Sequence, residues 1–327
     1  MMSSSPDPRN AASGAIERAA TELATAMRGK VSVNQRLARY TSFRVGGPAA
    51  ILVEPEDDAD LERMGTVISG LGIETLVLGR GTNVLIADGG FPGVVIRIGR
   101  GFEWIRESGR SEVEAGGGLP LPVVANWAAK RSLTGMEFAV AIPATVGGAV
   151  RMNAGAHGSS LSEVLRTARV YRLNAGLAEV LSVDGLGMSY RQTVLGPADV
   201  VCSARFHLSP GSKEEISARM EHHRKHRSTT QPSDAPNAGS MFKNPEGRSA
   251  GALIEEAGMK GHRVGGAEVS LKHANFFLAH AGATAQDVYD LMAHVQSEVL
   301  ARFEVLLIPE VRIIGAFDTT AGLITAA

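Results

Sequence analysis

Hydrophobic residues in the first hundred positions fall into short apolar runs around one segment of helical spacing. Runs of four or five apolar residues bounded by glycine, proline or charged residues are typical of buried strands, and apolar residues three and four apart indicate an amphipathic helix. The expected strands are 50–53, 75–78, 84–86 and 94–98, and the expected helices are 12–28 and 57–71. Residues 1–11 are polar and predict a disordered tail.

The middle of the chain is more β-like, and the last third is more helical. The expected strands are 111–115, 167–173, 200–208 and 305–314, and the expected helices are 121–131, 161–165, 212–227, 249–257 and 284–303. Ser212 is an expected N-cap with Glu215 placed for a capping box. Pro309 must interrupt its strand or lie at an edge, because it has no N–H to donate.

This pattern predicts an α+β fold in two main parts. The charged helix at 212–227 gives way to a polar stretch, 228–238, and we place a domain boundary in this region. The predicted division is a tail and helix over 1–30, a first domain over 31–208 and a C-terminal domain over 209–327.

Composition narrows the class of protein. With 33 Lys and Arg against 34 Asp and Glu, the chain is not a general binder of nucleic acid or anionic membranes. The single cysteine, Cys202, cannot form a disulfide within the chain, argues against a cysteine zinc site and is expected to be an inert core residue. The N-terminus has no signal-peptide pattern, and no run of 18 apolar residues predicts membrane insertion, so we expect a cytoplasmic protein.

Two glycine-rich segments are the first candidate binding elements. Gly79-Arg80-Gly81-Thr82-Asn83 lies between two expected strands, and 141–156 is a long stretch of small residues. Glycine lets the backbone approach a ligand, and successive N–H groups can form an anion nest. Each segment alone could be a close-packed turn, and neither is a Walker or Rossmann motif. Together they favour a large nucleotide cofactor.

Several isolated polar residues are candidates for chemistry, each with a structural alternative. Ser240 lies in a turn-rich segment and could be a cap. Glu310 lies in an apolar run, where it must be paired, protonated or directed outward. Arg191 after Tyr190 could be a surface residue. His222 and His226 share one helix face beside His223, but no acidic third ligand matches, so we expect a solvated basic helix that could face an anionic substrate, and no metal.

In chain order these signals resemble the UDP-N-acetylenolpyruvoylglucosamine reductase, or MurB, family. The resemblance runs from about Val33 to Gly315, and each motif alone is weak. Its segments are Tyr40 to Ala49, Leu78 to Asn83, Ile142 to Gly148, Asn153 to Gly155, Tyr190-Arg191, Gly239 to Pro245 and Pro309 to Arg312. The compact C-terminal region and Ser270 to Phe276 resemble the family's shorter type II form.

The resemblance implies a two-subdomain FAD-binding domain of the vanillyl-alcohol-oxidase type over 31–208 and a smaller substrate domain over 209–327. It implies non-covalent FAD, NADPH as the reductant and UDP-N-acetylglucosamine-enolpyruvate as the substrate of a monomeric enzyme of peptidoglycan synthesis. Hydride would come from flavin N5. The implied catalytic residues are Arg191 as the carboxylate clamp, protonated Glu310 beside it, and Ser240 as the proton donor.

The remaining implied site residues divide between cofactor and substrate. The cofactor set is Gly79, Arg80, Gly81, Thr82, Asn83, Ile142, Pro143, Thr145, Gly147, Gly148, Asn153 and Gly155. The substrate set is Tyr190, Lys243, Asn244 and Asn275. The chain departs from the family pattern at Thr82, where serine is usual, at Ala144, where glycine is usual, and over 227–234, which matches only at Gln231-Pro232.

Two rival interpretations remain open from the sequence. One is a flavin oxidase of the same superfamily, with His157 as a possible attachment residue for FAD; peroxide production without NADPH would favour it. The other is an inactive nucleotide-binding protein, which would be purified without colour. The joint presence of Arg191, Ser240 and Glu310 argues against the second.

Overall fold

The computed structural model describes residues 8–325, with side chains from residue 14 onward. The chain forms two compact units. Unit 1 contains the chain up to Gln35, Ala49–Gly79 and Pro92–Met220, and unit 2 contains Arg36–Pro48, Arg80–Phe91 and the chain from Glu221. The domains expected from the sequence were continuous, whereas two short segments of the N-terminal half belong to unit 2.

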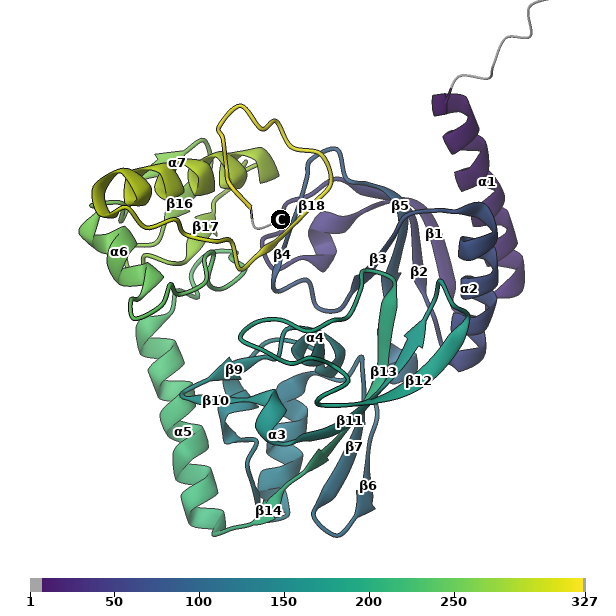
Figure 1. Ribbon diagram of the computed structural model, residues 1–327, viewed down its shortest axis with the longest axis horizontal. Coiled ribbons are helices and arrows are strands. Elements are labelled where there is room, and N and C mark those ends of the chain that lie inside the picture. Colours follow the sequence, from purple (N-terminus) through teal and green to yellow (C-terminus); the bar gives the residue numbers. More distant parts are fainter. Residues whose placement is uncertain (1–7, 326–327) are drawn as a thin grey trace, which may run out of the picture. The chain divides into compact units, whose positions relative to one another are not determined.

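The first layer of unit 1 is a four-stranded sheet covered by two helices. The helices are α1 (Pro8–Ala26) and α2 (Asp58–Leu71). The strands, in sheet order, are β1 (Lys30–Arg36), β2 (Pro48–Glu54), β5 (Phe91–Arg97) and β3 (Thr75–Leu78). Figure 1 shows α1 and α2 side by side along this sheet, and the apolar positions of α2 that were spaced three and four apart are buried there.

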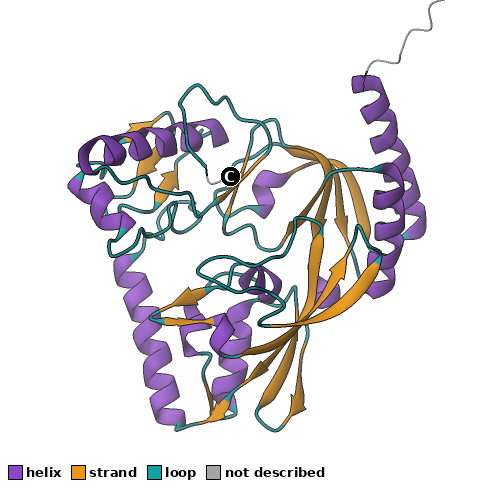
Figure 2. Ribbon diagram, in the orientation of Figure 1, coloured by secondary structure: helices purple, strands orange, loops and turns teal. Residues whose placement is uncertain are grey.

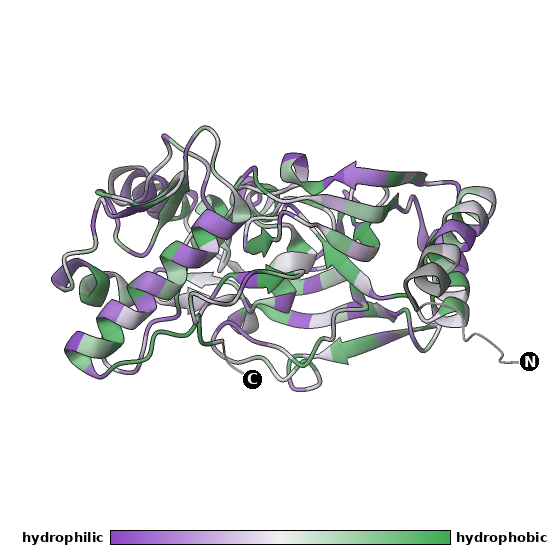
Figure 3. Cartoon of the chain, turned by 90° about the horizontal axis from the view of Figure 1, so that it is seen from above, coloured by the Kyte–Doolittle hydropathy of each residue, from purple (hydrophilic) through white to green (hydrophobic). Residues whose placement is uncertain are grey.

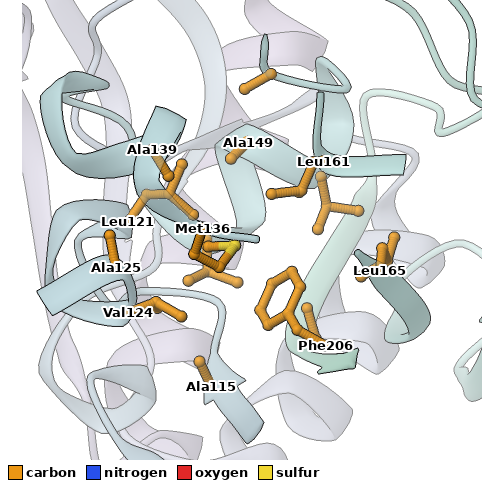
Figure 4. Close-up of a cluster of buried hydrophobic side chains, with 14 of the residues drawn as sticks. Ala115, Leu121, Val124, Ala125, Met136, Ala139, Ala149, Leu161, Leu165 and Phe206 are labelled. Atoms are coloured by element: carbon orange, nitrogen blue, oxygen red, sulfur yellow. The ribbon is translucent and has the colours of Figure 1, made fainter. Parts of the chain in front are cut away.

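The second layer of unit 1 is a five-stranded antiparallel sheet. Its strands, in sheet order, are β12 (Leu177–Ser182), β11 (Leu165–Arg172), β13 (Asp199–His207), β7 (Glu112–Gly116) and β6 (Ile105–Gly109). Helices α3 (Leu121–Lys130) and α4 (Val146–Arg151) pack on it. Figure 4 shows Met136 and Phe206 lying between Leu121 and Val124 on one side and Leu165 on the other. Short pairs complete the unit: β8 (Leu133–Thr134) with β14 (Ser209–Pro210), and β9 (Gly155–Ala156) with β10 (Ser159–Ser160).

Unit 2 has its own core and two small sheets. β4 (Val84–Ile86) pairs in parallel with β18 (Arg312–Ile314), which explains why residues 80–91 belong to this unit. The other sheet has the order β15 (Arg263–Val264), β16 (Ala267–Val269), β17 (Phe277–Ala279). Helices α6 (Ala250–Glu256) and α7 (Ala285–Phe303) bury their apolar faces against it, and Figure 2 shows how short its strands are beside α7.

Helix α5 (Lys213–Thr230) runs across the boundary between the units, which falls after Met220. Its buried residues Ile216 and Met220 are four apart and join the core of unit 1. The remaining elements likewise mix apolar and polar positions, and Figure 3 shows hydrophobic and hydrophilic residues interleaved along helices and strands. Such interleaving is expected where each element buries only one face.

Three of the longer strands that the sequence did not predict, β1, β6 and β12, lie at sheet edges. β1 is at one end of the four-stranded sheet, and β6 and β12 are the two ends of the five-stranded sheet. Their residues are mostly exposed or half-buried. An edge strand needs no continuous apolar run, so its sequence lacks the signal that identified β3 or β13.

Four local predictions need correction. The expected helix at 161–165 is a single 3₁₀ turn, Leu161–Glu163, because Leu165 already belongs to β11. The strand expected over 305–314 shortens to β18, and Pro309 makes only an isolated bridge with Phe242. Ser212 caps α5 as expected, accepting from the Glu215 N–H (3.3 Å), but its hydroxyl donates to Glu214, and the Glu215 carboxylate completes no capping box among the described residues. The tail prediction is wrong for 8–11, which begin α1, and residues 1–7 lie outside the described chain.

Candidate functional site

The two glycine-rich segments meet within unit 1. Thr145 is the N-cap of α4, and its hydroxyl accepts a hydrogen bond from the Gly148 N–H at 3.1 Å. A Cβ added to Gly79 would lie 2.6 Å from this Thr145 hydroxyl, which is too close for any larger residue without movement. The structure therefore brings Gly79, Thr145 and Gly148 together, so residues of both glycine-rich segments can contribute to one binding site.

A run of three glycines that the sequence reading passed over supports the same segment. Gly147 donates its N–H to the Gly117 carbonyl (2.8 Å), and a Cβ on Gly117 would lie only 1.9 Å from the Val201 carbonyl. The visible signal was Gly116-Gly117-Gly118 at the end of β7. Ile142 is half-buried and Pro143 is exposed. The Ala144 carbonyl accepts from the Leu121 N–H, and its side chain packs against the hydrophobic core of the unit, so alanine is accommodated here.

The rest of the first glycine-rich loop, residues 80–83, belongs to unit 2. Gly81 has φ +60°, and a Cβ there would lie 2.2 Å from the Tyr40 carbonyl, so only glycine fits without strain. The Gly81 carbonyl accepts from the Ser42 N–H at 2.9 Å. Arg80 is exposed, whereas Thr82 and Asn83 are half-buried. The loop is thus fastened to the Tyr40–Ser42 segment.

Ser42 carries a buried hydroxyl without a hydrogen-bond partner in the described chain. An unsatisfied buried hydroxyl costs about 1–3 kcal/mol, so such groups usually have a partner, a water or a ligand. Its place beside the Gly81 carbonyl fits a polar ligand held by this loop. Ser42 belongs to the Tyr40 to Ala49 motif, but nothing in the sequence distinguishes it from its neighbours. The burial of its hydroxyl depends on the tertiary structure.

Ser240 and Glu310 lie on neighbouring extended segments of unit 2. Between them runs the buried Met241, whose N–H donates to Asn275 (2.9 Å) and whose carbonyl accepts from the Glu310 N–H (2.8 Å). The Asn83 side chain donates to the Glu310 carbonyl at 3.2 Å. The structure therefore joins the Asn83 loop, Glu310 and Ser240 in one hydrogen-bonded arrangement.

The three predicted substrate residues of unit 2 differ in what their side chains do. Asn275 is buried and binds both backbone groups of Phe242, accepting from its N–H (3.0 Å) and donating to its carbonyl (2.8 Å). Asn244 accepts from the Ala250 N–H (3.0 Å) at the start of α6. Lys243 and Ser240 are half-buried, and no described residue forms a side-chain hydrogen bond or ion pair with either.

Arg191 lies in unit 1 at a tight turn. Ser189 and Gln192 exchange backbone hydrogen bonds (3.0 and 3.2 Å), with Tyr190 and Arg191 between them. Arg191 takes φ +58° and donates from Nη2 to the Gly155 carbonyl at 2.9 Å. Tyr190 is exposed, and the Arg191 guanidinium lies 5.1 Å from its ring centre. The turn is therefore fixed to the Asn153–Gly155 segment.

A second arginine, Arg312, has an unusual environment in unit 2. Burial lowers the pKa of its guanidinium, which stays cationic at neutral pH because an arginine starts far above that range. None of the described residues offers its guanidinium a carboxylate or a hydrogen bond, although its backbone N–H donates to Asn83 (3.1 Å). A half-buried cation without a counter-charge among the described residues fits an anionic ligand.

The other sequence candidates have plainer surroundings. His222 stacks on His226 with ring centres 6.4 Å apart, and no three His, Cys, Asp or Glu side chains of the described chain are grouped to hold a metal ion. Burial raises the pKa of the Cys202 thiol to about 12, as expected for an unreactive core cysteine. None of the helices within residues 8–325 is long and apolar enough to cross a membrane.

These features define an α+β protein with glycine-rich elements suited to a nucleotide cofactor, and the comparisons with known proteins identify it as a flavin-dependent oxidoreductase. An FAD-binding-domain model matches residues 49–179, and the model for the C-terminal domain of UDP-N-acetylenolpyruvoylglucosamine reductase matches residues 231–314. The chain is 41% identical to UDP-N-acetylenolpyruvoylglucosamine reductase 1 of Bacillus cereus over 92% of this chain and 100% of that protein. It is 40% identical to the Bacillus subtilis reductase over 92% of this chain and 99% of that one.

A solved structure of the same family also matches this chain. The crystal structure of this reductase (MurB) from Thermus caldophilus superposes with a TM-score of 0.77 at 37% identity, covering 88% of this chain and 100% of that chain. The chain therefore belongs to the UDP-N-acetylenolpyruvoylglucosamine reductase family and is an FAD-dependent oxidoreductase. The predicted family, the α+β fold class with an FAD-binding domain, and FAD as cofactor are confirmed.

Proposed function

We propose that this enzyme reduces UDP-N-acetylglucosamine-enolpyruvate to UDP-N-acetylmuramate with NADPH as the reductant, in the synthesis of peptidoglycan. The observation that carries the proposal is the arrangement of Ser240, Glu310 and Asn83 around Met241. It supplies a hydroxyl, a carboxyl group and a cofactor loop within one unit. The whole-length similarity to reductases named for this substrate supports the same assignment.

The chemistry of the substrate assigns a role to each residue. A vinyl ether accepts hydride only if its neighbouring carboxylate takes up the developing negative charge. Arg191 would bind that carboxylate, because a guanidinium can hold two oxygens in one plane. A protonated Glu310 would donate a hydrogen bond to the same group. Ser240 would then protonate the other carbon of the former double bond.

The cofactor would be held by the glycine-rich elements and by Ser42. FAD, when bound, supplies the hydride. Gly79, Thr145, Gly147 and Gly148 in unit 1 allow a close backbone approach, and the loop from Arg80 to Asn83 does the same in unit 2. Ile142, Pro143 and Gly155 complete the proposed cofactor set. Arg312 would stabilise negative charge on the cofactor or the substrate, since its half-buried guanidinium has no partner among the described residues.

On the substrate side, Lys243 and Tyr190 are the proposed contacts. Lys243 is free to bind an anionic substrate group or to assist Ser240, because an alcohol is a weak acid and needs electrostatic help. Tyr190 is exposed and available for contact with the sugar nucleotide. We propose that NADPH and the sugar nucleotide bind in turn, which predicts ping-pong kinetics.

A visible spectrum taken without oxygen tests the function. The purified enzyme should show oxidised flavin, lose that absorbance on addition of NADPH, and recover it on addition of the enolpyruvyl sugar nucleotide. UDP-N-acetylglucosamine, which lacks the enolpyruvyl group, is the control and should restore nothing. If the enolpyruvyl compound also restored nothing, the proposed substrate would be wrong.

Location and assembly are separate parts of the proposal. The cytoplasmic location and the monomeric state expected from the sequence remain predictions. Cell fractionation tests the first, and sedimentation velocity tests the second.

A further inference from the structure

The buried amide of Asn153 bonds to the residue at which the Arg191 turn begins. Asn153 is 6% exposed, and its Nδ2 donates to the Ser189 carbonyl at 3.1 Å. Its Oδ1 accepts from the Ser162 N–H at 3.0 Å. Ser189 begins the turn that contains Arg191. Both ends of the Asn153 amide therefore bind protein backbone, and one of these bonds goes to the first residue of the turn.

Further bonds between the same two segments show that the connection is not accidental. The Arg191 guanidinium donates to Gly155, two residues after Asn153 (2.9 Å). The Thr193 hydroxyl donates to the Arg151 carbonyl at 2.8 Å. The Arg151 guanidinium in turn donates to the carbonyls of Leu195 (3.1 Å), Gly196 (2.9 Å) and Asp199 (2.5 Å). Residues 151–155 thus hold the chain from 189 to 199 at several points.

The conformation of the turn explains why it needs to be held. Arg191 has φ +58°, in the left-handed region that non-glycine residues rarely occupy. Such a residue stays in place when its surroundings fix it. A flexible Arg191 would bind a carboxylate less well, because a displacement of about 1 Å at a reacting group can reduce a rate by about 100-fold.

We propose that Asn153 is a positioning residue that holds the Arg191 turn in its working conformation, and is not a ligand of the cofactor. The inference rests on the proposed role of Arg191 in binding the substrate carboxylate. It changes the role that the family resemblance implied for Asn153, because Nδ2 and Oδ1 both bind backbone and thereby hold the side chain against the turn.

Replacement by glycine gives a clean test. Asn153 has φ +39°, so Asn153→Gly removes both hydrogen bonds and leaves the backbone conformation accessible. Asn34 provides the matched control: it is also left-handed, with φ +49°, but its side chain is exposed in β1 and has no described partner. Asn34→Gly therefore makes the same chemical change without touching the turn.

Rapid-mixing measurements on the FAD-loaded enzyme separate the outcomes. For Asn153→Gly we expect reoxidation by the enolpyruvyl sugar nucleotide to slow about 10- to 100-fold. Flavin reduction by NADPH and the Kd for FAD should stay within about twofold of the wild-type values, as expected for a residue that makes no cofactor contact. Asn34→Gly should leave all three quantities unchanged.

A double substitution distinguishes positioning from a general structural role. If Asn153 acts through Arg191, Asn153→Gly should slow reoxidation little further once Arg191→Lys is present. Independent effects would multiply. Should Asn153→Gly fail to fold, Thr193→Val removes another bond to the same chain without altering residue 153, and the same slowing of reoxidation is expected.

The possible failures are distinct. If the wild-type enzyme is not reoxidised by the enolpyruvyl compound, the proposed function is wrong. If the wild type is reoxidised but Asn153→Gly reacts normally, or mainly loses FAD affinity, or multiplies the effect of Arg191→Lys, the positioning role is wrong.

Discussion

The two units differ in how many of their candidate polar side chains form hydrogen bonds within the protein. In unit 1, Thr145 caps α4, both ends of Asn153 bind backbone, and Arg191 donates to Gly155. In unit 2, Asn244 and Asn275 are similarly committed, but Ser240 and Lys243 form no side-chain hydrogen bond or ion pair with a described residue. The groups that remain available for a substrate are therefore concentrated in unit 2.

One sequence motif can contain both side chains that bond to the protein and side chains that remain available for a substrate. The segment Gly239 to Pro245 includes Ser240 and Lys243, which are available, and Asn244, which caps a helix. Removal of a side chain that bonds only to the protein should affect mainly stability, unless it positions a reacting residue as proposed for Asn153, whereas removal of an available side chain should affect chemistry. Each of the following substitutions can break or sharpen this distinction.

The largest effect is expected for Ser240→Ala. Loss of the proposed proton donor should slow reoxidation by the enolpyruvyl substrate about 10²- to 10⁴-fold, the usual range for a positioned acid. Flavin reduction by NADPH, the Kd for FAD and the melting temperature should not change, because the hydroxyl has no described partner. Stopped-flow absorbance measures both half-reactions.

A committed serine in the same unit is the control. The Ser249 hydroxyl accepts from the Ala252 N–H at the start of α6 (3.4 Å). Ser249→Ala should lower the free energy of unfolding by about 1 kcal/mol and leave both half-reactions intact. Equal slowing of both half-reactions in Ser240→Ala would contradict the proton-donor role.

Asn275→Ala should give the next largest effect, on stability. It leaves the N–H and the carbonyl of the fully buried Phe242 without partners, at about 1–3 kcal/mol for each buried group. We expect the free energy of unfolding to fall by about 2–6 kcal/mol, measured by urea denaturation. A fall below about 0.5 kcal/mol together with a raised KM for the sugar nucleotide would instead identify Asn275 as a substrate contact.

The fold could be predicted from the sequence where an element buries a continuous face. α2 and β3 carry such faces, and their bounds in the structure match the expected ones closely. The edge strands β1, β6 and β12 do not, because half-exposed strands resemble loops in composition. The assignment of residues 80–91 to unit 2 could not be predicted either, since it depends on β4 pairing with β18 more than 200 residues away.

The residues of the candidate site could be predicted from the sequence, but the hydrogen bonds that their side chains form could not. Glycine spacing identified Gly79 and 145–148, which the structure brings together. Ser42 and Arg312 were seen only as members of motifs, because an unsatisfied hydroxyl or a half-buried cation exists only after folding. Asn153 was assigned to the cofactor because a sequence cannot show that both ends of its amide bind backbone.

A committed carboxylate in unit 1 predicts a pH dependence of stability. Burial raises the pKa of Asp60, but backbone N–H groups of Glu56, Arg28 and Gly29 donate to it, and the net pKa lies below the usual value. A lowered pKa in the folded state stabilises the protein above the unfolded pKa of about 3.9, and this contribution is lost as the pH falls through the folded value.

Asp60→Asn should therefore lower the free energy of unfolding by about 1–3 kcal/mol at pH 7, and the gap from wild type should shrink below about pH 4. Asp58→Asn is the control, since Asp58 is half-exposed and pairs with Arg169 at the surface. Its effect should be at most about 1 kcal/mol. A gap between wild type and Asp60→Asn that stayed constant from pH 7 to pH 3 would contradict the assigned pKa shift.

The smallest effect, and the finest test of the comparison, is Asn244→Ala. The Asn244 side chain was expected to contact substrate, yet it accepts the Ala250 N–H at the start of α6. If that bond is its main role, the substitution should cost about 1 kcal/mol of stability, as for other helix caps, and leave the KM for the enolpyruvyl sugar nucleotide unchanged. Asn244→Asp retains the acceptor and should restore stability, because an anion is favoured at a helix N-terminus. If KM rose in Asn244→Ala while stability stayed constant, Asn244 would be a substrate contact, as proposed for Lys243, and its bond to Ala250 would not be its main role.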